Sequence, residues 1–403
     1  MESTRAPLRN DLVGRAAELV PFLRERSERT EEGRRLPEET IGALADAGVL
    51  RMRVPSRYGG HEADMRTMVE VLAQIGRGDG STAWTVSVWG IFAWLAGMYP
   101  HEVREEVFAD PDARISGILS KPGTAIPVDG GYLVSGRWAF NTGVTQSGWN
   151  MLLAIPTSTP EAAPASAPSA GDALPLLVLT RADEMTVVDD WHASGLRGTG
   201  SVTSVAKDVF VPSAHALPMR ALLKGHTEAQ LDPGSPFHRS PLFPTVAVCT
   251  VGTALGLARA AQETFLERLP GRRIAYTDYA SQREAPVTHL QVGEAAMLVD
   301  EAEFHARRAA ELLDAKATGG ETWTVDERVR VRTDVGAVCR RAKESVDILA
   351  TASGASSLYS SAPIQRIERD MRAVHQHASL HPNTTFELYG RVLCGLAPNT
   401  RNL

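Results

Sequence analysis

The spacing of the apolar residues changes twice along this chain, and that order restricts the fold more than any other feature. From residue 1 to about 112 they recur every three or four residues, as in "LPEETIGALADAGVL" at 36–50, which is typical of amphipathic helices. From 113 to about 220 the period is two, as in strands, and from about 244 it is helical again. The sequence therefore predicts an α+β protein with helices over 1–112, strands within 113–235 and helices over 236–403.

Turn and strand signals define the middle region. Asp129, Gly130 and Gly131 form a predicted turn beside the strand "YLVSGRWAF". Further strands are predicted at 150–156, 174–180, 185–191 and 201–212. Residues 157–174 are rich in proline, alanine and serine and contain no aromatic residue, so we expect a mobile loop between two strands rather than a linker between domains.

The C-terminal region contains four long segments with helical apolar spacing, at 246–269, 287–317, 325–352 and 364–396. Long amphipathic helices with short connections pack as a four-helix bundle. Pro382 interrupts the last segment, because proline disfavours helical geometry in the residue before it. We therefore expect a break near His381.

The composition argues against several classes of protein. A formal net charge of −6 disfavours a nucleic-acid-binding surface. Cys249, Cys339 and Cys394 have neither metal-site spacing nor the even number of a disulfide framework, which favours a reducing compartment. The first residues, "MESTRAPLRNDL", lack an apolar signal core, so we expect a cytoplasmic protein, and we expect no metal site.

One uncharged stretch, "GSTAWTVSVWGIFAWLAGMYP" at 80–100, is long enough to cross a bilayer. Its serines, threonines and glycines dilute its hydrophobicity and no basic cluster flanks it, so a buried helix is favoured over a membrane span. Ser81 is a candidate N-cap for this helix. The aromatic residues are most simply core, with Trp84 and Phe92 as candidates for the wall of a substrate cavity.

The strand "GGYLVSGRWAFNTGV" at 130–144 carries an unusual set of side chains. By the period of two, Trp138, Phe140 and Thr142 share one face. Ordinary core packing explains two neighbouring aromatics on one face. A platform for a flat, hydrogen-bonding ligand explains them as well, and the strand alone leaves both interpretations open.

Four stretches together carry a resemblance to a known family. They are "VPSRYGG" at 54–60, the strand at 130–143, "GLRGTGSVTSVAKDVFVP" at 195–212 and "SGASSLYSSAPIQRIERD" at 353–370. In this order and spacing they resemble the acyl-CoA dehydrogenase superfamily over nearly the whole chain. The resemblance implies an N-terminal helical domain, a middle β-barrel and a C-terminal four-helix bundle, assembled as a homotetramer, with a flavin ring between the barrel and the bundle.

The resemblance also assigns residues to the flavin. It places Phe140 against the isoalloxazine ring and Thr142 at the N5 edge, and Trp138 extends this platform. This favours the ligand platform over ordinary core packing. The other contacts with the cofactor that it implies are those of Ser120 at the pyrimidine end, Gly143 after the strand, Gly354 near the phosphate or adenosine portion and Arg283 as a flavin clamp.

The chain departs from the dehydrogenases of this superfamily at the acid that removes a substrate proton. In the commonest arrangement the acid follows an Arg-Asp pair by eight residues, but here the pair is Arg369-Asp370 and residue 378 is alanine. Residues 240–262, the alternative position, contain no Asp or Glu. The departure resembles the branch of two-component flavin monooxygenases, where a histidine and a Ser or Thr flank the flavin. Here these are His377 and Thr142, the predicted catalytic residues.

The charged residues near the pair are expected to interact with one another on solvated faces of their helix: Arg366, Glu368, Arg369, Asp370 and Arg372. Of the two histidines that follow, His375 and His377, at most one is expected to face inward.

The implied function is a monooxygenase that takes FADH2 (FMNH2 is the alternative) from a separate NAD(P)H:flavin reductase and uses O2 to hydroxylate an aromatic or indole-like small molecule in secondary metabolism. One alternative is the oxidation of an acyl thioester with an unusual base such as Glu344 or Glu387. Another is a non-catalytic binding protein on the same scaffold. Neither nucleic acid nor a membrane is an expected partner.

Overall fold

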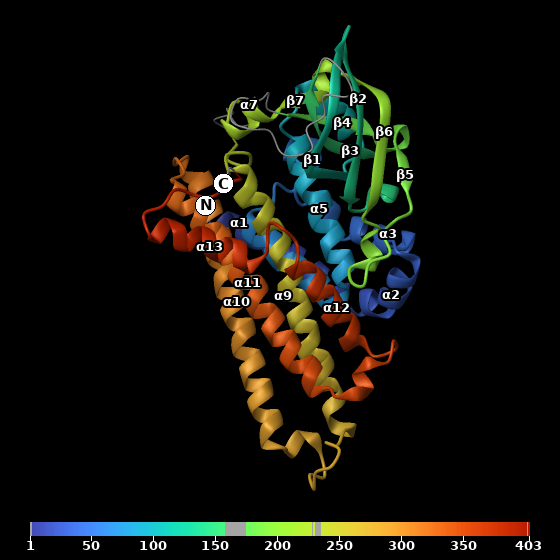
Figure 1. Cartoon of the computed structure of the whole chain (residues 1–403), viewed down its shortest axis with the longest axis vertical. Coiled ribbons are helices and arrows are strands. Elements are labelled where there is room, and N and C mark those ends of the chain that lie inside the picture. The colour runs from blue at the N-terminus through green and yellow to red at the C-terminus, as the bar shows by residue number, and fades with distance from the viewer. Residues whose placement is uncertain (1, 158–174, 228, 230–234, 401) are drawn as a thin grey trace.

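A computed structural model of the chain describes residues 2–157, 175–227, 229, 235–400 and 402–403. Figure 1 shows a sheet at one end of the molecule and long helices that extend to the other end, with the N-terminal helices beside both. The predicted order of helices, sheet and helices is confirmed. The predicted loop at 157–174 lies outside the described residues except for Thr157.

Six helices precede the sheet: α1 Glu2–Glu18, α2 Val20–Gly33, α3 Glu38–Asp46, α4 Met65–Gly78, α5 Gly80–Ala96 and α6 His101–Val107. Helix α5 is the uncharged stretch, and it is buried almost throughout. Its N-cap is Asp79, whose carboxylate accepts hydrogen bonds from the Thr82 backbone N–H at 2.7 Å and hydroxyl at 2.6 Å. The prediction that Ser81 caps this helix is wrong, because Ser81 already lies inside the first turn.

Seven strands in the described residues form one sheet in the order β5-β6-β2-β1-β3-β4-β7. Their bounds are β1 Ile115–Val128, β2 Gly131–Asn141, β3 Trp149–Pro156, β4 Leu176–Arg181, β5 Thr186–Val188, β6 Val202–Pro212 and β7 Ala216–Pro218. One apolar cluster receives Met185 beside β5, Trp138 from β2 and Val178 from β4. Strands from both halves of the sheet therefore cover the same core, as the predicted barrel requires.

After the short helix α7 Met219–Leu223, the chain forms the predicted helix bundle. Its helices are α9 Leu242–Arg268, α10 Pro286–Gly319, α11 Val325–Ala352, α12 Pro363–His375 and α13 Pro382–Leu393. The predicted interruption near His381 is confirmed, since α12 ends at His375 and α13 begins at Pro382. The turn at 376–381 between these two helices carries His377.

One helical stretch, Leu242–Gly271, is long and apolar enough by composition to cross a membrane. Its apolar window is 83% buried inside the protein, as expected of the central helix of a bundle. Helix α9 packs against α4 and α5 on one side and α11 and α12 on the other, which joins the N-terminal helices to the bundle.

Candidate active site

The end of strand β2 directs its aromatic side chains to opposite sides. Trp138 is fully buried in the core of the sheet, where its indole N–H donates to the Leu153 carbonyl at 3.0 Å. Phe140 is 70% exposed. The pairing of β2 with β6 shifts register between Trp138 and Asn141, and such an extra residue reverses the alternation of side chains. The prediction that Trp138 extends the face of Phe140 is therefore wrong.

Phe140 leaves most of its ring open at the margin of the sheet. Its ring meets the edge of Trp191, with 5.7 Å between centroids and 61° between planes. An open aromatic ring can take a flat, π-faced ligand in an offset or edge-on arrangement. Phe140 thus fits the predicted role of a platform for a flat ring.

Thr142 continues from Phe140 into a buried cluster of hydroxyls. Its Oγ1 lies 2.7 Å from the Oγ of Ser201, which lies 2.7 Å from the Oγ1 of Thr199. The Thr199 hydroxyl donates to the Leu196 carbonyl at 2.8 Å. The sequence pointed to Thr142 but not to Ser201 or Thr199, although "RGTGS" at 197–201 shows hydroxyls at alternate positions.

The loop at 195–201 is held in a strained conformation beside this cluster. Leu196 has φ 50 and ψ 36, in the left-handed region that non-glycine residues rarely adopt. Its N–H donates to the Asp370 carboxylate at 2.6 Å, and its carbonyl also accepts from the Trp191 indole at 3.0 Å. These bonds from two elements fix the position of the loop.

Asp370 is a buried carboxylate of α12, not the solvated residue that the sequence suggested. Burial and then the nearby Asp79 raise the pKa of Asp370 to about 7. A signal for burial was present, since Asp370 lies on the apolar stripe of Ile367, Met371 and Val374 at helical spacing.

Two arginines near Asp370 form bonds across the domains, although Arg369 also donates to Gln365 within α12 at 2.8 Å. The Arg369 guanidinium pairs with Glu31 of α2, and the Arg366 guanidinium donates to the Ser27 hydroxyl at 2.6 Å. The expectation that these arginines pair with Glu368 and Asp370 on solvated faces is therefore wrong. They join α12 to α2.

His377 lies in the turn between α12 and α13. Its Nδ1 is 2.8 Å from the Ser379 hydroxyl, and its ring meets Trp84 of α5 edge-on with 5.0 Å between centroids. His377 has an exposed surface, but the protein atoms around the ring desolvate it and lower the pKa of His377 to about 4. The imidazole is therefore neutral near pH 7. His375 instead lies beside His381, with 5.6 Å between ring centroids, so the two histidines have different neighbours.

Helix α5 brings the strand end and the turn together. Trp84 contacts His377, and a Cβ placed on Gly143 would lie 3.0 Å from Thr85 and 2.8 Å from Trp89. Gly143 also has φ 70, so both its conformation and its close approach to α5 require glycine. His377 and Gly143, the residue after Thr142, thus both adjoin α5. Phe92, the other candidate for the cavity wall, packs against β1 where a Cβ on Gly117 would meet its ring at 2.5 Å.

The remaining predicted flavin contacts lie in two places. Ser120 is exposed in β1 where its pairing with β3 shifts register. Gly354 has φ 66 and ψ −175, a conformation open only to glycine, and a Cβ there would lie 3.7 Å from Arg272 Nη2. Arg272 also donates to the Ser356 hydroxyl at 3.0 Å, so Arg272 is a candidate clamp that the sequence analysis missed beside Arg283.

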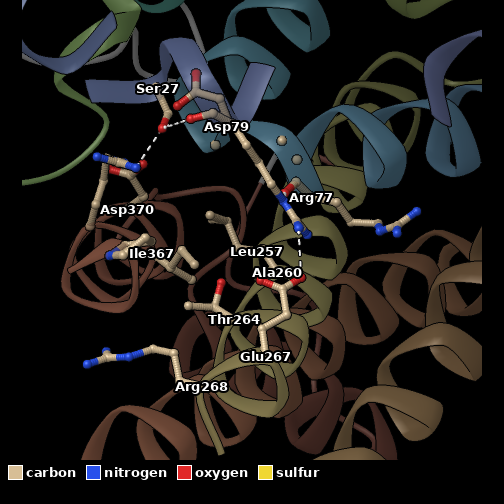
Figure 2. Close-up of a pocket in the computed structure, with 16 residues that line it drawn as sticks. Ser27, Arg77, Asp79, Leu257, Ala260, Thr264, Glu267, Arg268, Ile367 and Asp370 are labelled. Carbon is tan, nitrogen blue, oxygen red and sulfur yellow. Dashed lines mark hydrogen bonds and ion pairs between the residues drawn. The ribbon is translucent and has the colours of Figure 1, made fainter. Parts of the chain in front are cut away.

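A separate cavity of about 230 Å³ lies between α2, the α4–α5 junction, α9 and α12. Figure 2 shows Asp79 and Asp370 near Ser27 at one side of it, and Thr264, Glu267 and Arg268 of α9 at the other. Phe140, Thr142 and His377 are not among its lining residues. This cavity therefore adjoins the loop-holding Asp370 rather than the candidate active site. No cluster of three or more potential metal ligands occurs in the described part of the chain.

Comparison with known proteins identifies the family. Residues 15–107 match the family model described as acyl-CoA dehydrogenase, N-terminal domain, and residues 248–382 match that described as acyl-CoA dehydrogenase, C-terminal domain. The chain belongs to the acyl-CoA dehydrogenase family, in the branch of the oxygenase components of flavin-dependent monooxygenases.

Three relatives illustrate the similarity. The oxygenase component of the FADH(2)-dependent resorcinol hydroxylase of Rhizobium sp. (strain MTP-10005) is 31% identical, with 96% of this chain and 95% of that protein covered. The flavin-dependent monooxygenase oxygenase subunit HsaA of Mycobacterium tuberculosis is 32% identical, with 94% of each chain covered. The solved structure of XiaF from Streptomyces sp. in complex with FADH2 and glycerol has a TM-score of 0.90 and 32% identity, covering 100% of this chain and 99% of that one.

In the part of the chain that the structure describes, the candidate bases of the alternative dehydrogenase reaction form ion pairs and hydrogen bonds with residues other than Thr142 and His377. Glu344 of α11 pairs with Arg340 and Arg341. Burial raises the pKa of Glu344, but the hydrogen bonds from these arginines outweigh it, and the pKa is lowered. Glu387 is exposed on α13, where it accepts from Asn399 at 3.0 Å.

Proposed function

We propose that this protein is the oxygenase component of a two-component system, which uses reduced flavin and O2 to hydroxylate an aromatic or indole-like small molecule. The observation that carries the proposal is a neutral imidazole, His377, against Trp84 of α5, the helix that Gly143, the residue after Thr142, also approaches. Similarity to a relative named for resorcinol, an aromatic compound, supports the substrate class.

The residues present fit a flavin. Reduced flavin bound here would supply the electrons that activate O2. Phe140 would hold the ring through its open face, since aromatic groups attract one another in offset or edge-on arrangements. Thr142 would hydrogen-bond N5, and Ser120, Gly143, Gly354 and Arg283 or Arg272 would contact the remainder of the cofactor.

His377 and its neighbours would control protons at the site. A neutral imidazole can hold a proton on one nitrogen and accept one on the other. The Ser379 hydroxyl at Nδ1 orients the ring, and Trp84 packs edge-on against it. His377 is therefore suited to give or take a proton without the charge of a carboxylate.

The test supplies the protein with FAD, NADH, a flavin reductase, O2 and a panel of phenols and indoles. We expect a product that carries one oxygen atom from labelled O2. FAD and FMN tested in parallel decide the cofactor, for which we propose FAD. Bleaching of bound oxidised flavin by an acyl thioester under anaerobic conditions would instead identify a dehydrogenase.

A separate NAD(P)H:flavin reductase is the proposed partner, since the named relatives are components of such systems. The proposed location is the cytoplasm, where reduced nicotinamide and flavin are available, and the proposed setting is secondary metabolism.

An exposed apolar stripe on α10 supports assembly of several copies. Leu290, Met297 and Phe304 are 73%, 60% and 60% exposed and are spaced by seven residues, so they share one face of this 34-residue helix. Figure 1 shows α10 at the outer side of the bundle. Such a stripe is unfavourable in water and fits a self-complementary interface, and we propose a homotetramer.

A further inference from the structure

The buried hydroxyls of Ser201 and Thr199 connect the Thr142 hydroxyl to the backbone of the loop at 195–201. We propose that this chain of Thr142, Ser201 and Thr199 fixes the Thr142 oxygen as a hydrogen-bond acceptor, and that it thereby selects reduced flavin over oxidised flavin. The inference rests on the proposed function, because it assumes that Thr142 meets flavin N5. It assigns Ser201 and Thr199 as positioning residues that act through Thr142.

The direction of the hydrogen bonds between these hydroxyls follows from counting protons, starting at Thr199. A carbonyl oxygen can only accept, and each hydroxyl has one proton. The Thr199 hydroxyl therefore uses its proton on the Leu196 carbonyl, 2.8 Å away. The same carbonyl also accepts the Trp191 indole N–H at 3.0 Å and the Thr199 backbone N–H at 3.2 Å, so fixed donors hold it in place.

The next two bonds follow from the first. Thr199 has no proton left for the contact with Ser201 at 2.7 Å, so Ser201 must donate to Thr199. Ser201 then has none for the contact with Thr142 at 2.7 Å, so Thr142 must donate to Ser201. The free lone pairs of Thr142 remain available to a ligand.

Burial prevents the opposite direction from being equally populated. Thr199, Ser201 and Thr142 are 2%, 3% and 5% exposed, so water cannot replace a missing bond. In the opposite direction the Thr199 and Leu196 oxygens would face each other at 2.8 Å without a proton between them. The loop cannot move away easily, because Asp370 holds the Leu196 N–H at 2.6 Å and Gly143 N–H donates to the Thr199 carbonyl at 2.9 Å.

Reduced and oxidised flavin differ in their hydrogen bonding at N5. N5 of reduced flavin carries a hydrogen and donates, whereas N5 of oxidised flavin has only a lone pair and accepts. A Thr142 oxygen that can only accept therefore pairs with the reduced form and opposes the oxidised form. This preference suits an enzyme that receives reduced flavin from another protein and must release the oxidised flavin.

The experiment measures the dissociation constants of FAD and of dithionite-reduced FAD under anaerobic conditions, for the wild type and for Ser201→Ala and Thr199→Val. Either variant frees the Thr142 proton to rotate toward N5. In the wild type we expect the dissociation constant of oxidised FAD to exceed that of reduced FAD. The ratio of these two constants should fall about tenfold in each variant. Oxidised FAD should bind more tightly to the variants, which mere structural damage cannot produce.

Two matched variants complete the test. Ser345→Ala removes a buried hydroxyl of α11 that donates to the Ala295 carbonyl, and it should leave the ratio unchanged. Thr199→Ser keeps the hydroxyl and should keep the wild-type ratio. An unchanged ratio in folded Ser201→Ala and Thr199→Val, or a wild type that prefers oxidised FAD, would overturn the inference alone. A wild type that binds neither form would overturn the proposed function and the inference with it.

Discussion

The ring of Trp84 meets the ring of His377 edge-on, with 5.0 Å between their centroids. This contact joins a buried N-terminal helix to the turn that separates the last two helices of the bundle. In the described residues, the side-chain hydrogen bond of the ring goes to Ser379 and not to a carboxylate. The absence of a fixed negative charge explains why desolvation dominates the titration of His377.

Replacing His377 tests its role in directing protons. We expect His377→Ala to fold normally and to consume reduced flavin and O2, but to release more hydrogen peroxide. The yield of hydroxylated product should fall at least about tenfold, because general acid–base groups contribute at least this much. The measurement compares peroxide with product. His375→Ala is the matched control, since His375 lies beside His381 instead of Trp84. Unchanged coupling in His377→Ala would contradict the assignment.

The low pKa of His377 predicts how the enzyme responds to pH. With a pKa of about 4 in the folded protein, His377 stays neutral from pH 5.5 to 8, so its titration should cause no change in coupling across this range. Because the unfolded chain binds a proton below its pKa of about 6.5, this group makes the protein more stable as the pH rises from about 4 to 6.5. A histidine resonance that titrates near pH 6.5 and disappears in His377→Ala would show the assignment to be wrong.

Phe140→Ala tests the platform for the flavin. Loss of an aromatic contact and of its buried area should weaken the binding of reduced FAD about five- to tenfold, as expected for roughly 1 kcal/mol. Anaerobic titration measures the change. Phe210→Ala removes a partly exposed aromatic from β6 of the same sheet and should have no effect. Equal affinity of the wild type and Phe140→Ala would exclude the platform.

Asp370 should make the stability of the protein depend on pH. Its pKa rises from 3.8 to about 7 on folding, so the folded protein binds more protons in this window. Its contribution to stability is therefore present at low pH and is lost as the pH rises from about 4 to 7, by on the order of 2–4 kcal/mol. Asp370→Asn keeps an oxygen acceptor for Leu196 and should gain stability relative to wild type between pH 5 and 8 in denaturant titrations. The prediction would be contradicted if the free energies of unfolding of Asp370→Asn and wild type differed by the same amount at all pH values.

A charge on the α10 stripe should disrupt the assembly. We expect Leu290→Glu to elute as a smaller species in size-exclusion chromatography with light scattering, because a carboxylate would be buried at the interface without a partner. Val128→Glu places the same charge at an exposed apolar position of β1 and should leave the mass unchanged. A monomeric wild type would contradict the proposed interface.

The period of the apolar residues and the positions of glycine and proline determined much of the fold. They located the helix bundle, most strands and the break before Pro382, because these features depend on contacts within a few residues. The family motifs led to Phe140, Thr142 and His377. The strand β1 was not predicted, and Ser81 was taken as a cap although the aspartate two residues earlier accepts both bonds.

What only the tertiary structure decided depends on partners that are distant in the sequence. Phe140 points away from the core that holds Trp138 because β6 pairs with one residue fewer than β2 there, and no local pattern encodes the register of a partner strand. Asp370 is buried because a loop 174 residues away supplies its donor. By itself the sequence determined which side chains the protein has for its chemistry, whereas packing between domains decided their directions, their protonation and the single orientation of the hydroxyls behind Thr142.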